Sequence, residues 1–347
     1  MKEKDKAVFL SRGAGNIKRV YNNEIVQKLT SELEFPAEIV TLENIEQYKD
    51  FTNECKYIFS TWGMLELKED EIAKYFGKCE VVFYGAGSVQ YFARPYLNKG
   101  IRLVSAWVAN GVPVAEYAVS QILLACKGYF KAIKTNGGIK SQSDWHNTNK
   151  FLQANYKGNY NTKIGILGVG TIGKRVISYL QKLEIKAEIF VYDPYFSEKD
   201  AAAVNVKKAS LEDIFSTCDV ITNHIANLPS TVGMINKSHF SLMKDYSTFI
   251  NTGRGQQLVE SELAEVFKNN QTLTALLDVT SPEPPAENGE NSELYKLDNV
   301  IMTPHVAGVI GNELYRLSQM MYDELKLYES EKRLNYEVTL EMLEYMA

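Results

Sequence analysis

The sequence predicts an α/β protein built from two doubly wound, parallel-sheet domains, and three observations support this. The chain has 347 residues, which is too long for one small core and suits two domains of ordinary size. Short apolar runs alternate with amphipathic stretches over residues 7–104 and again from Thr162, as strands alternate with crossover helices. A glycine-rich turn at 168–173 stands halfway along the chain, so a complete α/β domain is expected before it.

Buried strands are predicted wherever a short apolar run occurs in the first series. These runs are 7–10, 37–40, 57–60, 81–84 and 101–104. Helix-like segments such as 68–76 lie between the last three runs. A long, largely apolar helix is predicted at 114–127. The polar residues 128–161, rich in Lys, Asn and Gly, are expected to form a connection along the surface.

Six further strands are predicted in the second series, which suits a dinucleotide-binding sheet. They are 163–167, 189–192, 219–222, 247–250, 274–277 and 300–302. A long helix predicted at 312–331 follows this sheet and is expected to return to the first domain. We therefore predict a discontinuous substrate-binding domain, 1–111 with 311–347, and a cofactor-binding domain, 112–310.

Composition and charge exclude several classes of protein. Hydrophobic residues make up 45% and charged residues 23%, as is ordinary for soluble globular proteins. The net charge of −5 does not favour binding to nucleic acid or to an anionic membrane. A charged N-terminus and interrupted apolar runs predict neither a signal peptide nor a transmembrane helix. The four cysteines show no Cys-x-x-Cys spacing, which predicts no metal site and indicates a cytoplasmic protein.

The turn at 168–173 has the spacing Gly-x-Gly-x-x-Gly. The pattern is weak by itself, but here it follows an apolar strand and begins an amphipathic helix at 172–183. Gly168 would permit the tight turn, Gly170 would let the backbone approach a pyrophosphate, and Gly173 would let helix and strand pack closely. The alternative is a glycine-rich turn that binds no ligand.

The helix after this turn would complete a dinucleotide site. Its unpaired N–H groups near Thr171 and Ile172, together with the positive end of its dipole, suit phosphate oxygens. Asp193 ends the next strand, twenty residues past Gly173. Its carboxylate can accept hydrogen bonds from ribose hydroxyls and would repel a 2′-phosphate. The sequence therefore predicts NAD, rather than NADP, as the cofactor.

Three polar side chains follow the ends of three strands predicted in the second sheet: Arg254, Glu283 and His305. Oxidation of a 2-hydroxy acid needs a base for the hydroxyl proton, a cation for the carboxylate and a partner that holds the base. Histidine, arginine and glutamate suit these three tasks. Each residue alone could be an ion-pair residue, a loop acid or a capping histidine. Together, after a nucleotide-binding turn, they predict a hydride-transfer site.

Several segments closely resemble those of the D-isomer-specific 2-hydroxyacid dehydrogenases. They are 110–116, 168–173, 251–255, 278–284, 294–300 and 303–308. This family includes phosphoglycerate, glycerate and D-lactate dehydrogenases and hydroxypyruvate/glyoxylate reductases. The resemblance implies a Rossmann-type NAD domain and a flavodoxin-like substrate domain, usually in a homodimer. It implies NAD-dependent hydride transfer at C2 of a small 2-hydroxy acid or 2-keto acid, similar to glycerate or hydroxypyruvate.

The resemblance also implies roles for single residues. Arg254 would bind the substrate carboxylate and carbonyl, His305 would be the general acid/base, and Glu283 would pair with it. Asp278 would lie near the nicotinamide carboxamide. Thr231 and Thr252 are further expected cofactor contacts.

In the first domain, the loop 85–87 resembles the one whose backbone amides hold the substrate carboxylate, so Ala86 and Gly87 are expected at the substrate. Trp62 is a further expected substrate contact, with core packing as the alternative. The chain departs from the family pattern where 88–90 read Ser-Val-Gln instead of the frequent Asp-Asn pair, and at Ala226 and Trp107. These departures leave the identity of the substrate open.

Two alternative functions stay open. A 3-phosphoglycerate dehydrogenase would need extra cations for the phosphate, and the first domain offers Arg12, Lys18, Arg19 and Arg94 without showing where they lie. A non-catalytic NAD(H)-sensing protein could keep the same three polar residues. The sequence shows no appended basic region that would serve such a role.

Overall fold

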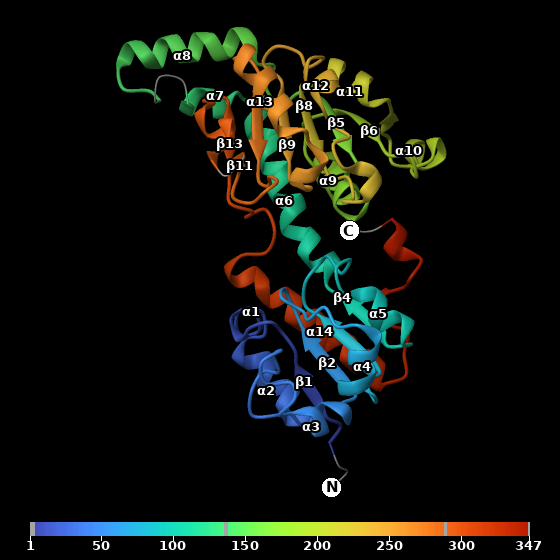
Figure 1. The fold of residues 1–347 in the computed structure, drawn as a ribbon. Helices are drawn as coiled ribbons and strands as arrows, with labels where there is room; N and C mark the ends of the chain where they lie inside the picture. Colours follow the sequence, from blue (N-terminus) through green and yellow to red (C-terminus); the bar gives the residue numbers. More distant parts are fainter. Residues whose placement is uncertain (1–3, 135–137, 288–289, 346–347) are drawn as a thin grey trace. The chain divides into compact units, whose positions relative to one another are not determined.

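The computed structural model describes residues 4–134, 138–287 and 290–345, and the chain divides into two compact units (Figure 1). Unit 1 comprises Met1–Gly111 with Val309–Ala347, and unit 2 comprises Val112–Gly308. Each unit contains one mainly parallel sheet with helices, so the predicted α/β class with two doubly wound sheets is confirmed. No helix in the described part of the chain is long and apolar enough to cross a membrane.

Unit 1 is built on a five-stranded sheet. Its order is β1 (Ala7–Phe9), β2 (Tyr57–Ser60), β3 (Val81–Tyr84), β4 (Arg102–Ser105) and β14 (Glu337–Val338). The first four strands are parallel, and β14 pairs antiparallel with β4. The short β14 comes from the C-terminal part of the chain and was not predicted.

The strand predicted at 37–40 is wrong as a full strand. Only Val40 forms an isolated parallel bridge, with Leu10. Ala37 and Glu38 are exposed, and Pro36 before them has no N–H to donate, so little pairing is stabilised there. With this bridge counted as the second strand in the chain, the parallel part of the sheet has the flavodoxin-like order 2-1-3-4-5.

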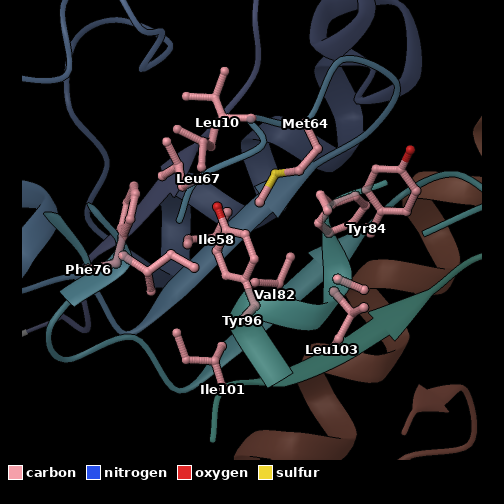
Figure 2. Close-up of a cluster of buried hydrophobic side chains, with 14 of the residues drawn as sticks. Leu10, Ile58, Met64, Leu67, Phe76, Val82, Tyr84, Tyr96, Ile101 and Leu103 are labelled. Carbon is pink, nitrogen blue, oxygen red and sulfur yellow. The ribbon is translucent and has the colours of Figure 1, made fainter. Parts of the chain in front are cut away.

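Helices cover both faces of this sheet, because successive strand residues point to opposite faces. Tyr57 and Phe59 belong to one buried cluster, and Ile58 belongs to the other. The cluster with Ile58 appears in Figure 2, where Tyr96 lies among strand side chains. It involves α3 (Lys49–Asn53), α4 (Glu69–Tyr75) and α5 (Ala93–Asn98), whereas the cluster with Tyr57 involves α1 (Ala14–Val20), α2 (Asn23–Glu32) and α14 (Tyr315–Glu329). The helices predicted at 68–76 and 312–331 are therefore present.

Unit 2 is built on a seven-stranded parallel sheet. Its order is β13 (Val300–Met302), β10 (Thr274–Leu277), β9 (Thr248–Asn251), β8 (Val220–Asn223), β5 (Lys163–Leu167), β6 (Glu188–Tyr192) and β7 (Lys207–Lys208). All six predicted strands are present, and from β7 inward the order corresponds to the Rossmann order 3-2-1-4-5-6 with one more strand at the end. The sequence did not show β7, because two lysines carry no apolar pattern.

Two buried clusters hold helices against the two faces of this sheet. One contains residues of α6 (Trp107–Cys126) and α9 (Thr171–Gln181). The other contains residues of α11 (Leu211–Thr217), α12 (Lys237–Phe240) and α13 (Glu260–Asn269). Helix α6 begins seven residues before the predicted 114–127, so it includes Pro113. The remaining elements are α10 (Glu198–Ala203), the hairpin β11 (Ala286–Glu287) and β12 (Glu290–Asn291), and the short 3-10 turns η2 (Pro229–Thr231), η3 (Gly255–Gln257), η4 (Glu293–Lys296), η5 (Gly311–Leu314) and η6 (Met342–Glu344).

The connection predicted along the surface at 128–161 contains two helices that the sequence did not show. They are α7 (Tyr129–Lys134) and α8 (Gln142–Asn155), which Figure 1 shows in green. Neither helix has a buried residue. The Ser141 side chain caps α8 by accepting a hydrogen bond of 3.0 Å from the Asp144 N–H. The sequence concealed α8 because an exposed helix needs no apolar face.

Candidate active site

The carboxyl ends of six parallel strands in unit 2 form one row across the sheet. In order, the row consists of Tyr192, Leu167, Asn223, Asn251, Leu277 and Met302. Several of the predicted site residues follow this row by one to three positions, among them Gly168, Asp193, Thr252, Arg254, Asp278 and His305. The register therefore places them along one edge of the sheet, which is where open α/β sheets bind ligands.

The glycine turn lies at this edge, between β5 and α9. Gly168 has φ +87°, and a Cβ atom there would lie 2.7 Å from the His224 carbonyl oxygen. A Cβ atom on Gly173 would lie 2.1 Å from the Gly168 oxygen, so neither position accepts a side chain. Gly170 differs, because nothing lies within 4 Å of its Cβ position. Backbone packing requires the outer two glycines, and the middle one leaves open space.

The residues at the start of α9 fit a pyrophosphate. The first-turn N–H groups of a helix have no intrahelical partner, and the N-cap Gly170 offers no side-chain oxygen to satisfy them. A bound anion would satisfy these groups and meet the positive end of the helix dipole. The open space at Gly170 allows a ligand to approach the backbone there.

Asp193 has a structural task that the sequence did not reveal. Its Oδ2 accepts a hydrogen bond of 2.7 Å from the Val169 N–H, and its Oδ1 accepts one of 2.8 Å from the Tyr195 N–H. The carboxylate thus ties the glycine turn to the loop after β6. Each oxygen has a second lone pair that can accept a ribose hydroxyl.

Glu283 and His305 are in direct contact. The His305 Nδ1 atom lies 2.9 Å from Glu283 Oε2, with both side chains about half exposed. Glu283 Oε1 accepts a long hydrogen bond of 3.4 Å from the Thr280 N–H. The His305 Nε2 atom has no hydrogen-bond partner among the residues that the structure describes. The glutamate therefore fixes one ring nitrogen and leaves the other available.

Asp278 holds the loop that carries His305. Its buried carboxylate accepts hydrogen bonds from Thr303 Oγ1 at 2.6 Å, the Val306 N–H at 2.9 Å and the Ala307 N–H at 2.9 Å. Its carbonyl accepts the His305 N–H at 2.9 Å. His305 has φ +53°, a conformation that few non-glycine residues adopt. The bonds to Asp278 on both sides keep the histidine in this conformation.

The Arg254 guanidinium has spare hydrogen-bond donors. Its Nη1 donates to the Gly253 carbonyl at 2.8 Å, and no carboxylate lies within ion-pair distance among the described residues. Burial lowers the pKa of Arg254 from its ordinary value, whereas the charge of Glu283 raises it. A partly buried, unpaired guanidinium close to Glu283 suits a substrate carboxylate.

His224 lies buried behind this edge, between two threonines. Its Nε2 lies 3.1 Å from Thr222 Oγ1 and its Nδ1 lies 3.2 Å from Thr252 Oγ1. Burial lowers the pKa of His224 to about 3, so the ring is neutral at pH 7. The hydroxyl of Thr231, another predicted cofactor contact, donates to the Ala226 carbonyl at 2.8 Å. The hydroxyls of Thr252 and Thr231 thus have partners within the protein.

In unit 1, the predicted substrate loop 85–87 follows β3. Thr61 Oγ1 donates to the Gly85 carbonyl at 2.8 Å, and Ser105 Oγ lies 2.8 and 2.7 Å from the Ala86 and Gly87 carbonyls. Both hydroxyls are buried. The N–H groups of Gly87 and the next residue have no partner among the described residues. The two hydroxyls therefore hold the three carbonyls of the loop, and its two free N–H groups can bind an anion.

Trp62 follows β2 and packs against both cores of unit 1 while keeping part of its surface exposed. The Arg19 guanidinium lies 5.9 Å from the centre of its ring. Arg12 and Arg94, which the sequence offered as phosphate contacts, each form an ion pair with a glutamate. Core packing explains part of the burial of Trp62, and two of the four candidate cations already have anionic partners.

The sequence of the chain is similar to those of a known family and of several known proteins. Residues 128–307 match the family model described as D-isomer specific 2-hydroxyacid dehydrogenase, NAD binding domain. The D-3-phosphoglycerate dehydrogenase of Archaeoglobus fulgidus is 32% identical over 210 residues, which are 60% of this chain and 37% of that protein. The putative 2-hydroxyacid dehydrogenase YoaD of Bacillus subtilis is 30% identical over 242 residues, which are 69% of this chain and 67% of YoaD.

Solved structures share the whole fold at low sequence identity. The holo form of Rhodotorula graminis D-mandelate dehydrogenase has a TM-score of 0.78 and 17% identity, covering 97% of this chain and 98% of that one. A phosphoglycerate oxidoreductase from Rhizobium etli has a TM-score of 0.77 and 19% identity, covering 98% and 100%. The match to the archaeal phosphoglycerate dehydrogenase spans little more than a third of that relative's length.

Proposed function

The chain belongs to the D-isomer specific 2-hydroxyacid dehydrogenases with an NAD-binding domain, and from this we propose that it transfers hydride between NAD and C2 of a small 2-hydroxy or 2-keto acid. One observation supports this above the others. The 2.9 Å contact between His305 Nδ1 and Glu283 Oε2 presents an available Nε2 at the same sheet edge as Arg254 and the glycine turn. A substrate similar to glycerate or hydroxypyruvate is our first choice.

The proposed chemistry assigns one task to each residue. Arg254 binds the carboxylate of the acid and polarises the oxygen on C2. In the oxidation, His305 Nε2 takes the proton from the C2 hydroxyl, and Glu283 stabilises the imidazolium that forms. NAD held at the glycine turn would supply the acceptor for the hydride that leaves C2. In unit 1, the loop residues Ala86 and Gly87 and the Trp62 side chain are proposed substrate contacts. The Gly87 N–H is the free donor of this pair, because the Ala86 N–H donates to the Tyr84 carbonyl at 2.8 Å.

The proposed cofactor site combines the glycine turn at 168–173, the first turn of α9 and Asp193, with Thr231, Thr252 and Asp278 as further contacts. We expect Asp193→Ala to raise the KM for NADH about tenfold and to reduce the preference for NADH over NADPH, since a charge-assisted hydrogen bond is lost. Steady-state kinetics with both cofactors measure this. An unchanged ratio of the two kcat/KM values would contradict the assignment of Asp193.

The decisive experiment is an activity screen with NADH and NADPH side by side. Glyoxylate, hydroxypyruvate, pyruvate and longer 2-keto acids are offered, and oxidation of the cofactor is followed by absorbance. We expect turnover with NADH on at least one of them. No turnover on any, with NADH binding intact, would contradict the dehydrogenase and favour a non-catalytic NAD(H)-sensing protein.

A 3-phosphoglycerate dehydrogenase is the second candidate, supported by the sequence similarity to enzymes of that name. The ion pairs of Arg12 and Arg94 with glutamates weaken this candidate, because a phosphate needs cations that are free to pair with it. Phosphohydroxypyruvate is therefore included in the same screen. A kcat/KM higher than that for hydroxypyruvate would reverse our preference.

We further propose a homodimer in the cytoplasm. Helices α7 and α8 have no buried residue, and the large side chains Ile133, Ile139 and Trp145 on and between them are 46%, 50% and 52% exposed. A second copy could cover this apolar surface, as isologous dimers do. We expect Trp145→Glu to shift the mass measured by light scattering toward the monomer.

The proposed location in the cytoplasm is supported by the cysteines. All four cysteines are free thiols, as is typical of a reducing compartment.

A further inference from the structure

Three fully buried amide side chains lie behind the Arg254 loop: Asn223, Asn251 and Gln257. The two asparagines end β8 and β9 and are register partners across the sheet. Gln257 ends the 3-10 turn η3, three residues after Arg254. Buried amide side chains need hydrogen-bond partners. The partners of these three side chains therefore show which parts of the backbone they hold in place.

The amides fix both backbone groups of Arg254. The Arg254 N–H donates to Gln257 Oε1 at 3.1 Å, and Asn251 Nδ2 donates to the Arg254 carbonyl at 3.3 Å. Asn251 Oδ1 accepts the N–H of Gly253 at 3.1 Å. No ion pair holds the guanidinium among the described residues. These hydrogen bonds therefore fix the backbone position from which the Arg254 side chain extends.

The same amides connect this loop to the loop after β8. Asn223 Nδ2 donates to Asn251 Oδ1 at 3.0 Å and to Gln257 Oε1 at 2.7 Å. Gln257 Nε2 donates to the Ile225 carbonyl at 2.6 Å, and Asn223 Oδ1 accepts the Ile225 N–H at 3.2 Å. The network is closed, so removing one amide leaves several buried groups without partners.

We infer that Gln257, together with Asn223 and Asn251, is a positioning residue that sets the Arg254 guanidinium for the carboxylate of the substrate. This inference rests on the proposed function. A guanidinium displaced by a small distance loses the geometry of a two-bonded carboxylate contact, although its charge stays. Gln257 therefore acts on substrate binding through Arg254 and touches no substrate itself.

Gln257→Met tests this, since methionine has a similar length and removes both amide functions. Gln256→Met is the matched control, because Gln256 is exposed and its side chain bonds only to Asn227 among the described residues. We expect Gln257→Met to raise the KM for the 2-keto acid by about 10- to 100-fold, with a smaller change in kcat and NADH affinity within about twofold of wild type. The control should match wild type.

Two more measurements distinguish a positioning role of Gln257 from a general loss of stability in the variant. Gln257→Glu keeps the acceptor oxygen for Arg254 and should recover part of the lost kcat/KM. Amide hydrogen exchange across 251–257 should accelerate in Gln257→Met and not in the control. Should Gln257→Met fail to fold, Asn251→Asp, which replaces the donor to the Arg254 carbonyl by a carboxylate oxygen, is measured in its place.

Each outcome decides a different question. An unchanged KM in active Gln257→Met, or an NADH affinity that falls as much as the KM rises, overturns the inference and leaves the proposed function intact. Wild-type protein that turns over no 2-keto acid overturns the proposed function. In that case the exchange measurement still decides whether Gln257 holds Arg254, and unchanged exchange would overturn that too.

Discussion

The carboxyl edges of the two sheets present different chemistry. At the edge of unit 2, the ionisable side chains of Glu283 and His305 are about half exposed, and buried side chains hold the loops, as Asp278 holds the His305 loop. At the edge of unit 1, the loop 85–87 presents backbone N–H groups, and the hydroxyls of Thr61 and Ser105 fix its carbonyls. One edge offers charge and proton transfer, and the other offers fixed dipoles.

This difference assigns proton transfer to the edge of unit 2 alone, whereas both edges offer donors for a carboxylate. Proton transfer needs a titratable group, which only side chains such as His305 supply. Holding a carboxylate needs only directed donors, which a backbone supplies at almost any sequence. Loss of the titratable side chain of His305 should therefore lower kcat, whereas mutations at the edge of unit 1 should raise the KM for the substrate.

The largest effect is expected from His305→Asn. Without the imidazole, the hydroxyl proton has no acceptor, and kcat should fall by about 10² to 10⁴-fold. Steady-state kinetics measure kcat, and NADH binding followed by fluorescence serves as the control, which should be unchanged. A loss below tenfold would remove His305 from the proposed mechanism and would weaken the contrast between the two edges.

The next effect is expected from Asp278→Asn. In the wild type, both carboxylate oxygens of Asp278 accept backbone N–H groups. The variant would place its side-chain NH₂ group, a donor, against one of these N–H groups, so the free energy of unfolding should fall by about 1–3 kcal/mol. Denaturant titration measures this. Asp213→Asn is the control, because that side chain is exposed on α11, and its change should stay within about 0.5 kcal/mol. Equal stability of both variants would contradict the anchoring role.

The buried His224 predicts a pH effect on unit 2. Its pKa in the folded protein is about 3, whereas the ordinary value is 6.5. Between these values the unfolded chain binds more protons, so the free energy of unfolding falls as pH is lowered from 6.5, by at most about 1.4 kcal/mol per pH unit from this group. Denaturant titrations at several pH values should show a shallower slope for His224→Gln. Parallel slopes would contradict the prediction.

The smallest effect is expected in unit 1, from Ser105→Ala. Loss of the hydroxyl releases the Ala86 and Gly87 carbonyls, which should lower the free energy of unfolding by about 1 kcal/mol and raise the KM for the keto acid about fivefold, with kcat nearly unchanged. Ser31→Ala, at an exposed helix position, is the control. A fall in kcat that exceeded the rise in KM would contradict the division of labour between the edges.

Much of unit 2 could be predicted because its signals are side chains or glycines at fixed positions. The strands could be predicted from their apolar runs. The residues after them, such as Arg254 and His305, follow the row formed by the carboxyl ends of the strands. The sequence did not show the hydrogen bonds of Gln257, because an amide in a loop has no pattern. It also missed α8, whose lack of an apolar face removes the period that predicts helices.

Unit 1 is assembled from both ends of the chain. Helix α14 supplies Leu317, Met321 and Leu325 to its core, and Val338 pairs with Leu103 at the edge of its sheet. On a ribosome, the first 111 residues must wait for roughly ten to fifty seconds of elongation before these partners emerge. Unit 2 is contiguous and can close during that time. We expect the nascent unit 1 to expose an apolar sheet face to chaperones until translation has passed residue 338.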